Sequence, residues 1–254
     1  MVAGNAQALS TGPLTVNGGT LRLDGYNLGF ASLAGTGGQI ENGSGGTPAV
    51  LTIGSGQSDS QVSTYSGRLV DGAAASLSLL KVGPGTAQLT HTNTYSGPTW
   101  ISNGTLRVDG QLAGTGVVYV ASNGVLAGYG SVSNVDVRGG TLAPGPQHTN
   151  FTVRGSLLIR ADSTYRWEIT NAAGVAGTHW DLLTAHNQLE FVGVGAGRVT
   201  LDVVCASASL PGYDSNQAAE WKMASAASVV GFATNLFSLR AAAFAPGLGG
   251  GTLG

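Results

Sequence analysis

The sequence predicts an all-β solenoid, in which short strands wind into stacked coils, and three observations indicate this fold. Segments recur along the chain: residues 101–110 (ISNGTLRVDG) have a near copy at 15–25 (TVNGGTLRLDG) and looser copies at 120–128 and 137–144. Asn-Gly and Asp-Gly pairs bracket the closest copies. Glycine accounts for 42 of the 254 residues, while only 9% are charged. Repeated short strands between fixed turns are the signature of a solenoid.

Each repeat is expected to contain one half-buried strand. In residues 104–110, Leu106 and Val108 alternate with polar residues, which places the aliphatic pair on one face of the strand. Stacked coils would bury that face against the equivalent residues of the neighbouring coil. The other short strands expected before residue 91 are 14–16, 38–41, 49–53, 76–82 and 86–90. Residues 54–61 are expected to form a turn or a projecting loop.

The corners of the coils are assigned to residue types that tolerate a positive φ or that bond their own backbone. An Asn-Gly pair is also a strong hairpin signal. We favour coils because the same corners flank similar strands in the same order. The predicted structural turn residues are Asn17, Gly18, Asp24, Gly25, Asn103, Gly104, Asp109, Gly110, Asn123, Gly124 and Asp181.

One segment carries a family resemblance. Residues 80–110 (LKVGPGTAQLTHTNTYSGPTWISNGTLRVDG) closely resemble the passenger-associated-transport repeat, also called the autotransporter-associated β-strand repeat. One copy is nearly complete, and partial copies extend the resemblance over residues 15–145. The resemblance implies a right-handed parallel β-helix of a bacterial protein that is secreted or displayed on the outer cell surface. In that family the repeat aids secretion and folding of the passenger.

The chain is expected to divide near residue 150. Residues 1–150 are predicted to form the repeat-containing solenoid, and residues 151–254 a more irregular continuation of it or a β cap. A cleanly alternating strand is expected at 163–169, with Tyr165, Trp167 and Ile169 on one face. Residues 218–227 fit either a short helix or a strand, and we favour a strand. At about 20 residues per coil, the chain would make about a dozen coils.

Composition excludes several partners. The formal net charge is −2 and the 11 Lys and Arg residues are scattered, so no basic patch for nucleic acid is expected. No apolar run reaches the ~18 residues that a transmembrane helix needs, so no transmembrane segment is expected. The one cysteine, Cys205, lies in an apolar run and is interpreted as a small core residue.

A search for catalytic or metal-binding groups predicts no catalytic residues, no cofactor and no metal site. Asp24 and Asp109 occupy matching repeat positions, but each precedes a glycine at a corner, where a turn role explains it. His179, Asp181 and His186 lack a further strong metal ligand nearby. The four tryptophans could line a sugar-binding face, but packing in the core is the preferred interpretation. The chain is therefore predicted not to be an enzyme.

The expected function is structural. Solenoids usually close their ends with polar caps, and neither residues 1–10 nor 249–254 resemble one. Open ends would let copies associate end to end into an extracellular fibre or surface layer. The alternative is an adhesin that presents loops such as 54–61 or 144–150 to a glycan or host surface. A polysaccharide-degrading β-helix enzyme is the third possibility.

Overall fold

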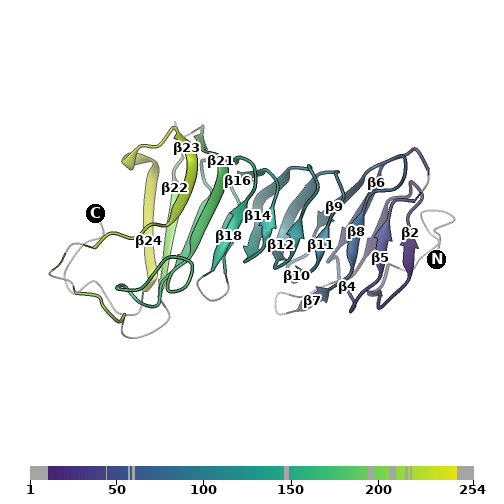
Figure 1. The fold of residues 1–254 in the computed structure, drawn as a ribbon, viewed down its shortest axis with the longest axis horizontal. Coiled ribbons are helices and arrows are strands. Elements are labelled where there is room, and N and C mark those ends of the chain that lie inside the picture. The colour runs from purple at the N-terminus through teal and green to yellow at the C-terminus, as the bar shows by residue number, and fades with distance from the viewer. Residues whose placement is uncertain are drawn as a thin grey trace.

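The chain folds into an elongated stack of coils (Figure 1). The structure, a computed structural model, describes residues 11–43, 45–56, 58, 61–145, 149–193, 197–205, 210–214, 217 and 219–244. The two uncapped segments expected from the sequence, 1–10 and 249–254, lie outside these residues, as do parts of the loops at 54–61 and 144–150. Every pairing between named strands is parallel, so the fold is the predicted parallel β-helix.

Each coil contributes to three faces, which we number 1 to 3. Face 1 contains β3 (Leu28–Phe30), β6 (Ala49–Ile53), β9 (Leu77–Lys81), the first part of β12 (Thr99–Val108), the first part of β14 (Val118–Gly128), β16 (Val135–Arg138), β19 (Leu157–Arg160) and the last parts of β21 (Leu182–Val192) and β23 (Ala224–Val230).

Face 2 contains β1 (Leu14–Thr15), β4 (Leu33–Ala34), β7 (Val62–Tyr65), β10 (Thr86–Leu89), the second parts of β12 and β14, β17 (Thr141–Pro144), β20 (Thr164–Glu168), β22 (Val199–Cys205) and β24 (Phe237–Phe244). A 3-10 turn at Thr234–Leu236 leads into β24.

Face 3 contains β2 (Thr20–Arg22), β5 (Gln39–Glu41), β8 (Arg68–Val70), β11 (Thr92–Asn93), β13 (Gln111–Leu112), β15 (Ser131–Val132), β18 (Asn150–Val153) and the first parts of β21 and β23.

The hydrophobic core runs through the centre of the stack. Period-2 alternation sends every second side chain inward, where it meets the residue at the same register one coil away. On face 1, Leu51 pairs with Leu79, and Val118 pairs with Val135. None of these four side chains is more than 1% exposed. The predicted pair Leu106 and Val108 is also fully buried.

The coils are shortest in the middle of the stack and longest at its C-terminal end. On face 1, Thr99 pairs with Val118 and Val118 with Val135, so these coils take 19 and 17 residues. Further along, Leu157 pairs with Leu189 and Leu189 with Val229, which are 32 and 40 residues apart. Face 2 therefore stacks ten strands in the described residues, against about a dozen coils expected, because the later coils include long excursions between strands.

Parallel pairing continues across residues 145–150: β17 pairs with β20, and β15 pairs with β18. Tyr165, Trp167 and Ile169 are all buried, as the alternation predicts. Within the described part of 218–227, strand β23 begins at Ala224 and no helix forms. No helix in the described part of the chain has the length and apolar character that a membrane span needs.

Candidate functional site

Three of the predicted turn pairs, Asn17-Gly18, Asp24-Gly25 and Asp109-Gly110, lie at corners between strands. Asp24 and Gly25 both have positive φ, 49° and 85°, in the turn after β2. Asn17 and Gly18 lie in the bend between β1 and β2, where the Asn17 Oδ1 accepts a hydrogen bond from the backbone N–H of Thr36 on the next coil. Corners of this kind use side-chain oxygens to satisfy backbone donors of a neighbouring coil.

The other Asn-Gly pairs lie inside long strands. Asn103 and Gly104 are in β12, and Asn123 and Gly124 are in β14, where the two pairs are in register with each other. The strand register shifts between Ile101 and Asn103, and Gly104 has a φ of 68°. These pairs therefore mark a bend at which one continuous strand passes from face 1 to face 2.

The pair Asp109-Gly110 follows β12, at the start of the passage to face 3. The Asp109 carboxylate accepts hydrogen bonds from the Arg107 Nε (2.9 Å) and, from the preceding coil, the Gln88 amide (2.6 Å). Asp24 occupies the matching position and pairs with Arg22 at 3.5 Å. Each of the two matched aspartates thus binds side chains close to it on the surface of the stack. The two carboxylates belong to different coils and do not form a pair.

Asp181 is completely buried just before β21. Its carboxylate accepts hydrogen bonds from the backbone N–H groups of Thr149 (3.2 Å) and Glu168 (3.0 Å). Burial raises the pKa of Asp181 to about 7, which outweighs the lowering by these two donors. His179 bonds the backbone of Val175, and among the described residues no group of three His, Cys, Asp or Glu could hold a metal ion.

Sequence reasoning missed the polar side chains inside the coils. Asn93 is fully buried, accepts from the Leu69 N–H (2.9 Å) and donates to the His91 carbonyl (2.8 Å). Lys81 is fully buried in register with Ile53 and Ile101. The alternation Leu77, Leu79, Lys81 was a signal for that inward lysine, whereas no local pattern distinguishes Asn93.

The outer surface of face 1 carries a row of interacting side chains that we call the face-1 strip: Trp100, Tyr119, Asp136, Arg138 and Arg160. Strand alternation places these residues on the outside. In β16, for example, Val135 and Val137 point into the core, so Asp136 and Arg138 point outward. Trp100 is 36% exposed and stacks on Tyr119, with ring centroids 6.3 Å apart and an interplanar angle of 20°. The Arg138 guanidinium lies over the Tyr119 ring, 4.3 Å from its centroid. The other three tryptophans are buried or half-buried.

Asp136 joins the two arginines of the strip. Its carboxylate accepts from the Arg138 Nε (2.8 Å) and from the Nε and Nη2 of Arg160 (2.7 and 2.9 Å). The Asp136 side chain is 7% exposed, whereas those of Arg138 and Arg160 are 52% and 38% exposed. Burial would raise the pKa of Asp136, but the hydrogen bonds from Arg160 and Arg138 lower it below its usual value. Asp136 is therefore an anion that fixes two exposed cations.

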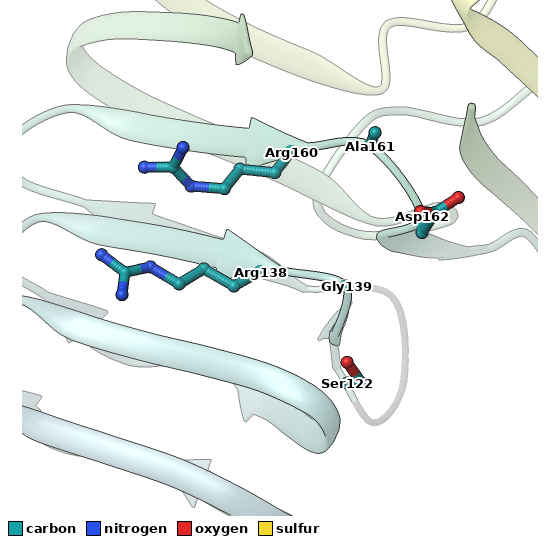
Figure 2. Close-up of a pocket in the computed structure, with 6 residues that line it drawn as sticks. All are labelled: Ser122, Arg138, Gly139, Arg160, Ala161 and Asp162. Carbon is teal, nitrogen blue, oxygen red and sulfur yellow. The ribbon is translucent and has the colours of Figure 1, made fainter. Parts of the chain in front are cut away.

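An open pocket of about 560 Å³ lies beside the two arginines. Figure 2 shows the Arg138 and Arg160 side chains extending side by side from neighbouring strands, with Asp162 and Ser122 at the corner that follows. Gly139 and Ala161 complete the lining. The pocket is therefore a shallow recess along a surface, lined by the two arginine side chains, the Ser122 hydroxyl and the Asp162 carboxylate.

Comparison with known proteins identifies the repeats. The model of the passenger-associated-transport-repeat family matches residues 8–23 and 79–108. These two segments of the chain are similar to passenger-associated-transport repeats. An extracellular serine protease from Serratia marcescens is 35% identical over 94 residues, which cover 37% of this chain and 9% of that protein. The chain thus matches only a small part of that relative's length. The repeat match and the similarity to an extracellular protease support a secreted or cell-surface protein.

Proposed function

We propose that this repeat protein is an extracellular structural rod whose copies associate end to end. The carrying observation is the pairing of the outermost described strands. Among the described strands, β23 and β24 pair only with the preceding coil. The free edge of such a strand offers backbone donors and acceptors to another strand.

The C-terminal described coil also exposes apolar side chains. Val229, Val230, Phe232 and Leu239 are 43–60% exposed. Phe232 packs at its inner side against Phe191 and Phe237, with centroids 6.0 and 5.5 Å away. Contact of this coil with the opposite end of a second copy would bury these side chains. Because the two surfaces differ, the contact is heterologous and extends into a filament unless its rotation closes a ring.

Size-exclusion chromatography with light scattering, and negative-stain imaging, test the proposal at micromolar protein. We expect rods longer than one chain and a mass above the 25.3 kDa monomer. Phe232→Asp should return the protein to monomers, because it places a charge in the contact. Val62→Asp is the matched control, since Val62 is 62% exposed but lies away from both ends, on β7. A monodisperse wild-type monomer at these concentrations would contradict the proposal.

The prediction that the chain is not an enzyme stays a prediction. The serine protease match covers 9% of that relative, and no proteolytic role for this chain is based on it. Incubation with polyuronates and with casein, followed by assays for new reducing ends and new amino groups, would test it. Turnover of either substrate would favour the enzyme alternative.

A further inference from the structure

The geometry points to the face-1 strip as a binding site for an acidic polysaccharide, with sugar rings packed on Trp100 and a carboxylate of the polymer bound by Arg138. This site lies on the side of the rod, so it is independent of the end-to-end contact. It also differs from the loops at 54–61 and 144–150 that the sequence suggested.

The length of the strip favours a polymer over a single sugar. Trp100 is in register with Tyr119, and Tyr119 with Asp136. Asp136 is in register with Leu158, which lies two residues before Arg160 and on the same strand face. Neighbouring coils are ~4.8 Å apart, so the strip spans roughly 14 Å along the rod axis. An oligosaccharide laid along the axis would meet an aromatic side chain first and the guanidinium groups farther along.

The charge of the strip favours an anion. Two guanidinium groups face one carboxylate, so Asp136, Arg138 and Arg160 together carry a net charge of +1 in a chain of net charge −2. Each arginine contacts Asp136 through Nε and Nη2, so its Nη1 donors remain for another acceptor. The guanidinium group presents its donors in one plane, and a planar carboxylate can accept from two of them at once.

The neighbouring acidic groups place the anion at the Arg138 end. Glu190 is in register with Leu158 on the coil beyond β19 and acts electrostatically on Arg160. Asp162 lines the pocket at the corner after Arg160. Both disfavour an anion near Arg160. Arg138 is instead flanked by Tyr119, which holds its guanidinium in place by a cation–π contact.

Trp100 supplies apolar surface for the sugar. Its indole is exposed on an otherwise polar strand face, and its stacking on Tyr119 fixes it in one orientation. A fixed aromatic side chain loses little conformational entropy on binding. The strip therefore combines a rigid apolar contact with rigid donors, which is the usual composition of a ligand site.

Titration calorimetry of the intact protein with polygalacturonate oligomers tests the proposal, with the methyl-esterified oligomers and dextran sulfate as comparison ligands. We expect binding of polygalacturonate that weakens as salt is added. The neutral ester and dextran sulfate should each bind at least about tenfold more weakly. The loss of one charge-assisted contact is worth about tenfold in affinity. We therefore expect Arg138→Gln to weaken binding about tenfold, and Trp100→Ala to weaken it several-fold.

Arg240→Gln is the matched control. Arg240 pairs with Asp202 on face 2 at 2.8 Å, and its side chain is 55% exposed, close to the 52% of Arg138. This variant should bind as the wild type does. Arg138→Lys keeps the charge but loses the planar set of guanidinium donors. Its affinity for polygalacturonate should therefore lie between those of the wild type and Arg138→Gln. It replaces Arg138→Gln in the test if that variant does not fold.

Four results would overturn the proposal: no binding by the wild type, equal binding of the methyl ester, equal binding of dextran sulfate, or an equal loss in Arg240→Gln. Thermal unfolding of each variant separates lost affinity from lost structure. Because the strip is lateral, binding should also be unchanged in Phe232→Asp, and a loss there would contradict a site independent of assembly.

Discussion

The ammonium group of Lys81 donates a hydrogen bond to the backbone carbonyl of Asn103 on the next coil, at 3.1 Å. It also donates to the carbonyls of Val82 and Gly83, at 2.8 and 2.7 Å. These carbonyls lie at the corner where β9 ends and β12 bends. A cation inside the stack thus satisfies three acceptors of two neighbouring coils. Burial lowers the pKa of Lys81 from 10.5 to about 8.

The lysine should make stability depend on pH in the alkaline range. Because the pKa is lower in the folded state, the folded protein binds the proton less tightly than the unfolded chain. The free energy of unfolding contributed by Lys81 therefore rises as pH increases from about 8 to 10.5 and is constant below that window. Relative to Lys81→Met, the wild type should gain about 2 kcal/mol across it. Urea unfolding at pH 7.5 and pH 10 measures this difference, and parallel curves for the two proteins would contradict it.

Asp181 should make stability depend on pH in the acidic range. Its pKa is raised to about 7 in the folded state, so the folded protein binds the proton more tightly than the unfolded chain. Stability from this group is fully present below pH 3.8 and is lost as pH rises toward 7. The wild type should therefore lose about 2–4 kcal/mol relative to Asp181→Asn between pH 4 and pH 7.5. Denaturant unfolding at both pH values checks it, and no change in the difference would refute the raised pKa.

Asp136 should contribute more to stability than Asp202. Asp136 pairs with two arginines, one on its own strand and one on the neighbouring strand, whereas Asp202 pairs with one. Asp136→Asn should lower the free energy of unfolding by about 1–2 kcal/mol, and Asp202→Asn by less than about 1 kcal/mol. Both losses should vanish in acid, where the wild-type carboxylates are protonated, since the arginines lower both pKa values. Thermal unfolding at pH 7 compares the two variants, and equal losses would argue against the shared role of Asp136.

Close stacking should make some glycines irreplaceable. A Cβ on Gly130 would overlap the carbonyl oxygen of Gly110 on the coil beneath, whereas a Cβ on Gly18 would meet no atom within 4 Å. Gly130→Ala should therefore cost at least about 2 kcal/mol, because backbone must move. Gly18→Ala should change stability by less than about 1 kcal/mol. Chemical denaturation of both variants measures the contrast, and a tolerated Gly130→Ala would show that the coils are not packed so closely.

The sequence by itself determined the coiled architecture and the direction of most side chains. Leu106 and Val108 in the repeat, and Tyr165 and Trp167 beyond it, point inward as their alternation predicts. This succeeded because alternation is local: the backbone of a strand sends neighbouring side chains to opposite faces wherever it lies. The repeats added the order of strands and corners, since copies of one segment must occupy equivalent places in successive coils.

Only the tertiary structure decided which residues meet across coils. Asp136 lies beside Arg160, 24 positions along the chain, and Lys81 lies beneath Asn103. Such contacts depend on the length of every coil between the partners, and that length ranges from 17 to 40 residues on face 1. The stacking register is set by the burial of whole coils against each other, which no local pattern specifies. For that reason the face-1 strip emerged only once the coils were stacked.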